Sequence, residues 1–135
     1  MGVVIYTDGG ARGNPGPAAA GVVILNGAEK TEVMQYLGDR QTNNWAEYEA
    51  VIIALGKLLE MGLRDTDLEF RLDSLLVVEQ LKGNWKIKEP ELKKQVAKVK
   101  SLLKDFGTVS FTHIPREENA EADRLVNEAL DEGGI

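Results

Sequence analysis

The spacing of apolar positions divides the chain into nine predicted elements. Apolar or alternating runs predict five strands, over residues 3–6, 19–25, 31–37, 68–72 and 109–112. Apolar residues at steps of three and four predict four helices, over residues 42–61, 75–81 and 90–103 and from residue 117 onward. Asn26-Gly27 is a strong hairpin signal, so the first three strands should form an antiparallel meander. The order of elements predicts one α/β domain over residues 1–135, built on a mixed sheet.

The first predicted strand leads into a glycine-rich stretch, Gly9 to Pro17. Val3 to Tyr6 is apolar, which places Asp8 at the carboxyl end of this strand, where ligands usually bind in α/β sheets. Roughly ten residues separate the first strand from the second, whereas hairpin connections usually take about two to five. We therefore expect the stretch to be either a plain connector or a loop that contacts a ligand.

The composition restricts the class of protein and the kind of metal site. At 135 residues with 43% hydrophobic content, the chain is long enough to bury a core. The absence of cysteine excludes thiolate metal sites, and a single histidine argues against zinc, so any metal would have oxygen ligands, as magnesium, manganese and calcium prefer. There is no charged leader and no apolar run near 18 residues, so we expect an unprocessed cytoplasmic protein without membrane contact.

The charge is distributed unevenly along the chain. The net charge of -6 argues at first against a nucleic-acid partner, because phosphates attract lysine and arginine. Between Lys82 and Lys104, however, eight lysines face two glutamates, a local charge of +6, which leaves -12 on the remainder. The lysine-rich segment is therefore either a solvated helix face or a basic contact surface.

Four acidic residues stand at predicted strand ends or helix starts: Asp8, Glu47, Asp73 and Asp123. Structural explanations exist for two of them, since a carboxylate in a first helical turn stabilises the helix dipole, as Glu47 would, and Asp73 is an N-cap candidate. The spacing along the chain does not show that the four meet. If they do, their repulsion calls for hard divalent cations, and a pair of such ions suits phosphodiester cleavage.

Four sequence motifs resemble those of the type 1 ribonuclease H family, in the same order and over nearly the whole chain. The first is Thr7-Asp8-Gly9-Gly10 followed by Gly13-Asn14-Pro15-Gly16-Pro17, the second is Thr42-Asn43-Asn44-Trp45-Ala46-Glu47, and the third is Asp73-Ser74. The fourth is His113-Ile114-Pro115-Arg116-Glu117-Glu118-Asn119-Ala120-Glu121-Ala122-Asp123.

The resemblance implies both a fold and an activity. The implied fold is ribonuclease H-like, a five-stranded mixed sheet with its first three strands antiparallel and about four flanking helices. The implied reaction is hydrolysis of the RNA strand of RNA/DNA hybrids, which leaves 5′-phosphate and 3′-hydroxyl ends and uses two Mg²⁺ ions, with Mn²⁺ as a substitute. Metal binding and catalysis would fall to Asp8, Glu47, Asp73 and Asp123.

Further residues receive roles, each beside a structural alternative. His113 matches the histidine of a mobile loop in the family, which implies proton transfer or help with product release. Contacts to the hybrid are expected from Gly9, Gly10, Asn14, Thr42, Asn43, Asn44, Trp85 and Arg116. Polar groups beside Glu47 suit recognition of the 2′-hydroxyl, which distinguishes RNA from DNA. The alternatives are turn and cap chemistry for the asparagines, a core position for Trp85 and pairing with neighbouring glutamates for Arg116.

Two positions depart from the family pattern. Many members insert a lysine-rich helix and loop after the second helix, a basic protrusion that grips the hybrid, whereas here residues 82–89 run almost directly into the Pro90 helix. Leu75 also stands where relatives often have a polar side chain. We expect weaker and more salt-sensitive hybrid binding than in relatives that have the protrusion, with the segment from Lys82 to Lys104 partly compensating for its absence.

Two other classes of function compete with a hybrid nuclease. An inactive hybrid-binding module would keep the fold, but the presence of all four acids argues against it. A sugar-kinase or actin-like phosphotransferase requires two domains around its nucleotide, and a P-loop nucleotidase requires a Lys-Ser/Thr pair after the glycines, which is missing here. We expect a monomer without an obligate protein partner.

Overall fold

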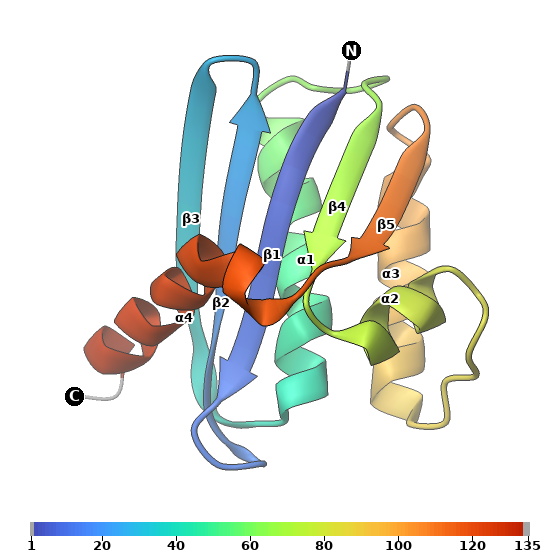
Figure 1. Ribbon diagram of the computed structural model, residues 1–135. Coiled ribbons are helices and arrows are strands. Elements are labelled where there is room, and N and C mark those ends of the chain that lie inside the picture. Colours follow the sequence, from blue (N-terminus) through green and yellow to red (C-terminus); the bar gives the residue numbers. More distant parts are fainter. Residues whose placement is uncertain (1, 134–135) are drawn as a thin grey trace.

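The structure, a computed structural model, describes residues 2–133 and is organised around one five-stranded sheet (Figure 1). The strands are β1 (Val3–Ala11), β2 (Gly16–Asn26), β3 (Glu29–Gln41), β4 (Leu68–Leu72) and β5 (Val109–His113). The helices are α1 (Asn43–Glu60), α2 (Leu75–Leu81), α3 (Pro90–Leu103) and α4 (Ala120–Gly133), the last preceded by a short 3₁₀ helix, η1 (Arg116–Asn119). None of the α-helices over residues 2–133 is both long and apolar enough to cross a bilayer.

The strands lie in the order β3-β2-β1-β4-β5. β1 pairs antiparallel with β2, and β2 pairs antiparallel with β3. β4 pairs parallel with β1, and β5 pairs parallel with β4. The predicted fold class is therefore confirmed, and the carboxyl ends of the parallel strands lie at one edge of the sheet.

Helices cover the two faces of the sheet unequally. α1 and α3 lie behind the sheet, whereas α4 crosses in front of β2 and β3 (Figure 1). The main core lies between the sheet and the rear helices and includes the fully buried Ile5, Tyr48 and Phe70. Thr42 fixes the start of α1, because its side chain accepts a hydrogen bond from Trp45 N at 3.1 Å. The rear face is thus packed, and part of the front face stays open.

The glycine-rich stretch after the first strand is mostly strand. β1 continues through Asp8 to Ala11, paired residue for residue with Ala18 to Gly21 of β2. Only residues 12–15 connect the two strands, so the predicted connection of about ten residues is wrong. The pairing of these segments cannot be predicted from the sequence, because glycine and alanine are weak strand formers and show no apolar alternation. Asp8 consequently lies inside β1, beyond the point where β1 and β4 separate.

Residues 82–89 join α2 to α3 without a helix or strand. Gln80, which is 5% exposed, anchors this segment. Its side-chain nitrogen donates to Lys86 O at 3.1 Å, and its side-chain oxygen accepts from the Tyr48 hydroxyl at 2.6 Å. The connection is therefore tied to both α1 and α2 through one buried carboxamide.

Candidate active site

Three acidic side chains from separate elements converge where β1 and β4 part. Asp8 comes from β1, Glu47 from α1 and Asp73 from the residue after β4. One carboxylate oxygen from each lies within 4.8 Å of the others. Asp8 and Glu47 are buried, with 7% and 8% of their surface exposed. The fold thus brings three of the four predicted carboxylates close enough together to hold one metal ion.

Glu47 reaches the site because α1 packs directly against β1. The Gly9 main-chain nitrogen donates to Glu47 Oε1 at 2.8 Å. A side chain at Gly9 would collide with the main chain of Ala46, so glycine permits the close approach. Glu47 is the fifth residue of α1, and the first turn of the helix holds no acid, so the helix-dipole explanation is wrong. Its position is set by the strand it faces.

Asp73 stands between the end of β4 and the start of α2. Ser74, and not Asp73, caps α2, since its hydroxyl oxygen accepts from Val77 N at 3.3 Å. Asp73 Oδ2 instead accepts from the side-chain nitrogen of Asn119 at 3.4 Å. The division of roles leaves the Asp73 carboxylate directed into the acidic cluster.

Asp123 lies at the edge of the cluster, in the first turn of α4 as predicted. With Asp8, Glu47 and Asp73 it lines one cavity of about 420 Å³. Its Oδ1 lies 3.9 Å from a guanidinium nitrogen of Arg116. All four predicted carboxylates therefore border a single cavity, with Asp123 at its more exposed side.

Burial and mutual repulsion raise the pKa of the central carboxyl groups. The pKa of Asp8 rises from 3.8 to about 8, first because of burial and then because of the charges on Asp73 and Asp123. Burial, followed by the charge of Asp8, raises the pKa of Glu47 well above its ordinary value. Burial also raises the pKa of Asp73, against the opposing effect of the Asn119 hydrogen bond. In the absence of cations, this concentration of negative charge costs stability.

A stability measurement can detect that cost through Asp8→Asn in metal-free protein. A carboxyl group whose pKa is raised on folding binds more protons in the folded state, so stability falls as pH rises from 3.8 toward about 8. Asparagine carries no charge at any of these pH values. The Tm of Asp8→Asn should exceed that of the wild type by a margin that grows over this interval. Thermal unfolding in EDTA across this pH range measures the margin, and a margin that narrows with rising pH would contradict the buried charge cluster.

The donor set suits a hard divalent cation. Carboxylate oxygens are the ligands that Mg²⁺ and Mn²⁺ prefer, and three elements supply them within 4.8 Å. A cation held there would also offset the repulsion that raises the pKa of Asp8. The residues present therefore fit the metal that the resemblance implies.

The predicted hybrid contacts near the start of α1 also hold the turn between β1 and β2. Asn43 Oδ1 accepts from Ala11 N at 2.8 Å, and Asn14 Oδ1 accepts from Asn43 N at 3.0 Å. Thr42 caps α1, as described above. The cavity is lined by Gly9, Gly10 and Asn43, and its lining does not include Asn14, Thr42 or Asn44. The turn and cap alternatives are thus present in the structure, and they fix one edge of the cavity.

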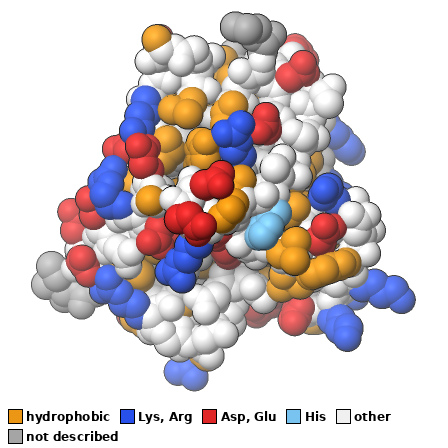
Figure 2. Space-filling model, in the orientation of Figure 1, with side chains coloured by type: hydrophobic (Ala, Val, Ile, Leu, Met, Phe, Trp, Pro, Cys, Tyr) orange, Lys and Arg blue, Asp and Glu red, His pale blue; other side chains and the backbone are white. Residues whose placement is uncertain are grey.

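Among the remaining candidates, His113 and Trp85 do not line the cavity. His113 is the last residue of β5. Arg116 opens η1 and lines the cavity. Trp85 is 44% exposed, so the core alternative for this tryptophan is wrong. Leu75 is exposed to the same extent, and Figure 2 shows hydrophobic side chains at the surface over α2, beside the pale blue histidine.

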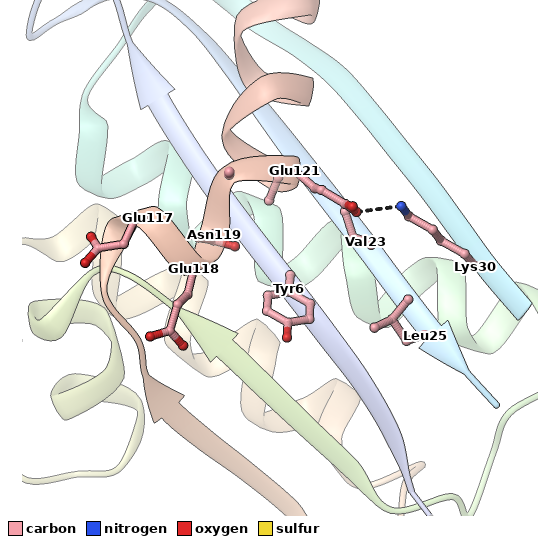
Figure 3. A pocket seen from close by; sticks show the side chains of 10 residues that line it. Tyr6, Val23, Leu25, Lys30, Glu117, Glu118, Asn119 and Glu121 are labelled. Carbon is pink, nitrogen blue, oxygen red and sulfur yellow. Dashed lines mark ion pairs between the residues drawn. The ribbon is translucent and has the colours of Figure 1, made fainter. Parts of the chain in front are cut away.

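A second cavity, of about 260 Å³, lies on the open front of the sheet (Figure 3). Tyr6, Val23 and Leu25 contribute its apolar surface, and an ion pair of 2.7 Å between Lys30 and Glu121 crosses one side. None of the four predicted catalytic carboxylates lines this cavity. The acidic cavity is therefore the candidate active site.

Comparison with known proteins identifies the family. Residues 6–129 match a family model described as "Reverse transcriptase-like". A ribonuclease H of Clostridium botulinum is 36% identical over an alignment of 152 positions, which covers 98% of this chain and 98% of that protein. The chain belongs to the ribonuclease H family.

Similar members of the ribonuclease H family include a protein of known structure and a longer protein. LC11-RNase H1, crystallised in complex with an RNA/DNA hybrid, is 48% identical and superposes with a TM-score of 0.92 over 98% of this chain and 99% of that one. The predicted ribonuclease H-like fold is thereby confirmed. A bifunctional protein of Mycobacterium tuberculosis is 42% identical over 134 residues, and the chain spans 36% of its length.

Two site residues of this ribonuclease H family member received no role from the sequence. Asn127 lines the acidic cavity, and its side-chain nitrogen donates to Asp123 O at 3.1 Å. Asn127 lies one helical turn after Asp123, and this spacing could have indicated that the two residues share one face of the helix. Asn119 is 1% exposed and contacts Asp73, although it lies at the entrance of a helix, where asparagine is common.

Proposed function

We propose that this chain is an endoribonuclease that hydrolyses the RNA strand of RNA/DNA hybrids. The observation that carries the proposal is the convergence of Asp8, Glu47 and Asp73 within 4.8 Å, beside Asp123 in one cavity. Relatives at 36% and 48% identity are named ribonuclease H, and one of them was crystallised with a hybrid. We assign metal binding and catalysis to the four carboxylates and expect 5′-phosphate and 3′-hydroxyl products.

The acidic cavity would supply this reaction with carboxylates that the fold holds in place. Two Mg²⁺ ions held by the four carboxylates would stabilise the attacking and leaving oxygens of an in-line phosphoryl displacement. Glu47 is held in place by the Gly9 nitrogen, and Asp8 is fixed within a paired strand. Gly10 lines the cavity without a Cβ, which leaves room for a sugar-phosphate backbone to approach. Mn²⁺ would satisfy the same oxygen donors.

The eight lysines between Lys82 and Lys104, here called the lysine surface, are proposed to grip the hybrid. Residues 82–89 hold no separate helix, and Gln80 bonds to the Lys86 carbonyl oxygen, so the first lysines are fixed relative to α2. Trp85 is exposed between them and offers an aromatic surface to the DNA strand. Arg116 offers a phosphate contact at the cavity itself. This arrangement would replace a basic protrusion.

Charge reversal tests the lysine surface. Lys86→Glu, Lys88→Glu and Lys93→Glu combined should raise KM for the hybrid and reduce the slope of log KM against log salt by about one for each lysine–phosphate pair that is removed. The matched control reverses Lys30, Lys57 and Arg64, which changes net charge equally outside this surface. Steady-state kinetics across a salt series measures both constants. If the first variant and the control gave the same KM and slope, the lysine surface would not bind the hybrid.

Substitution of His113 tests the histidine at the end of β5. His113→Ala should lower kcat by roughly 10²-fold with KM little changed, because a positioned acid or base acts in the transition state. Single-turnover and steady-state rates separate the two implied roles, since a defect in product release leaves the single-turnover rate intact. Wild-type values for both rates would remove His113 from the mechanism.

A panel of three duplexes tests the proposed substrate. An RNA/DNA hybrid, a DNA duplex and an RNA duplex of one sequence are incubated with the protein and Mg²⁺, with each strand labelled in turn. We expect cleavage of the RNA strand of the hybrid and no cleavage of the DNA duplex. Cutting of the DNA strand, or equal cutting of the DNA duplex, would overturn the proposed specificity.

A further inference from the structure

Asn119 lies at the fork where β4 leaves β1. The parallel ladder between these strands ends at the pair Tyr6 and Arg71, and Thr7 is the next residue of β1. Asn119 is the last residue of η1 and is 1% exposed. Figure 3 shows its side chain against β1, whereas the two glutamates before it extend away from that strand. Asn119 therefore lies beside β1 just past the end of its pairing with β4.

The carboxamide nitrogen of Asn119 joins two of the elements that carry catalytic acids. It donates to Thr7 O at 2.9 Å and to Asp73 Oδ2 at 3.4 Å. Both partners accept and do not donate, so the nitrogen and not the oxygen must face them. Thr7 directly precedes Asp8, and Asn119 precedes Asp123 by four residues. The Asn119 side chain thus connects the chain segments that carry Asp8, Asp73 and Asp123.

Packing alone does not account for an asparagine at this position. Its Oδ1 is buried and has no hydrogen-bond partner among the residues that the structure describes. A buried unpaired polar atom reduces stability, and an apolar side chain of the same shape would avoid that loss. The residue type is therefore explained by the two hydrogen bonds that its nitrogen donates.

We propose that Asn119 is a positioning residue, which holds the Asp73 carboxylate and the β1 main chain next to Asp8 at the spacing that bound divalent cations require. This inference rests on the proposed function. Groups that orient metal ligands affect metal affinity or activity by about 10–100-fold when they are removed. Asn119 would act through Asp73 and would contact neither the cations nor the hybrid.

A matched pair of variants separates positioning from stability. Asn119→Leu replaces the carboxamide with an apolar side chain and removes its donor. Gln95→Met does the same to a second buried carboxamide, which donates to Trp45 O at 2.9 Å and to Glu49 Oε2 at 3.0 Å and also has an unpaired oxygen. Gln95 lies between α1 and α3, outside the acidic cavity. The two substitutions therefore remove the same kinds of hydrogen bond, and only one of them removes a hydrogen bond to Asp73.

The readouts are Mn²⁺ binding by calorimetry, the Mg²⁺ concentration for half-maximal cleavage, and kcat and KM for the hybrid. Asn119→Leu should bind Mn²⁺ about tenfold or more weakly, need correspondingly more Mg²⁺ and have a lower kcat, with KM for the hybrid unchanged. Gln95→Met should lower the thermal stability by about as much as Asn119→Leu does. It should keep the wild-type values of all these constants.

Wild-type Mn²⁺ affinity in Asn119→Leu would overturn the proposal. Equal weakening in Gln95→Met would overturn it as well, because the effect would then reflect general stability. If the wild type bound Mn²⁺ but cleaved no hybrid, the proposed function would fail, while the Mn²⁺ affinities of the two variants would still decide whether Asn119 positions Asp73.

Discussion

Asp8→Asn is expected to lower cleavage of the RNA strand by roughly 10³-fold or more, a loss of about 4 kcal/mol in transition-state stabilisation. One carboxylate oxygen from each of Asp8, Glu47 and Asp73 lies within 4.8 Å of the others, so Asp8 would be a central ligand of any cation held there. Asparagine has the same shape but offers one neutral oxygen in place of a charged carboxylate. The fold should persist, since the substitution removes repulsion. Single-turnover cleavage at saturating Mg²⁺ measures the rate, and equilibrium titration measures hybrid binding.

A second aspartate provides the control for this prediction. Asp105→Asn makes the same change outside the acidic cavity, where Asp105 pairs with Arg64 at 2.9 Å. Its cleavage rate should equal that of the wild type. Retention of more than about a tenth of the rate by Asp8→Asn would mean that Asp8 does not hold catalytic cations.

Gly9→Ala is expected to reduce the free energy of unfolding by roughly 3 kcal/mol or more and the Tm by roughly 10 °C or more. The added Cβ would collide with the main chain of Ala46 and Glu47, which cannot turn aside as a flexible side chain can. Relief of the clash requires α1 to move away from β1. Glu47 would then lose the hydrogen bond from the Gly9 nitrogen, and cleavage should fall together with stability.

The neighbouring glycine supplies the comparison. A Cβ at Gly10 would lie 3.5 Å from Val126 Cγ1, an ordinary van der Waals contact. Gly10→Ala should therefore cost less than about 1 kcal/mol of stability. Thermal and urea unfolding of both variants provide the measurement, and equal decreases for the two would show that the approach of α1 to β1 is not set by Gly9.

The sequence predicts those elements whose apolar spacing is regular. α1 follows from apolar residues at steps of three and four, and α3 follows from its apolar stripe and Pro90 at its first position. The extension of β1 through Ala11 could not be predicted in this way. Its strand character comes from pairing with the small residues Ala18 to Gly21 across the hairpin, and local pattern carries no trace of that pairing.

The acidic site depends on contacts between distant parts of the chain. Nothing in the spacing of Asp8, Glu47 and Asp73 shows that they meet, and the resemblance to ribonuclease H supplied their grouping. Packing of α1 on β1 and parallel pairing of β1 with β4 bring them together. Asn119 was missed for the same reason, since its bond to Thr7 O joins residues separated by 112 positions.

Metal-dependent cleavage of RNA is tested most directly with one RNA/DNA hybrid that carries different labels on its two strands. The hybrid is incubated with wild-type protein in Mg²⁺, in EDTA, and in EDTA followed by excess Mg²⁺. We predict RNA fragments with 5′-phosphate and 3′-hydroxyl ends in Mg²⁺, none in EDTA, recovery when Mg²⁺ is restored, and an intact DNA strand throughout. Intact RNA with both Mg²⁺ and Mn²⁺, while the hybrid stays bound, would contradict the proposed nuclease and would indicate an inactive hybrid-binding module.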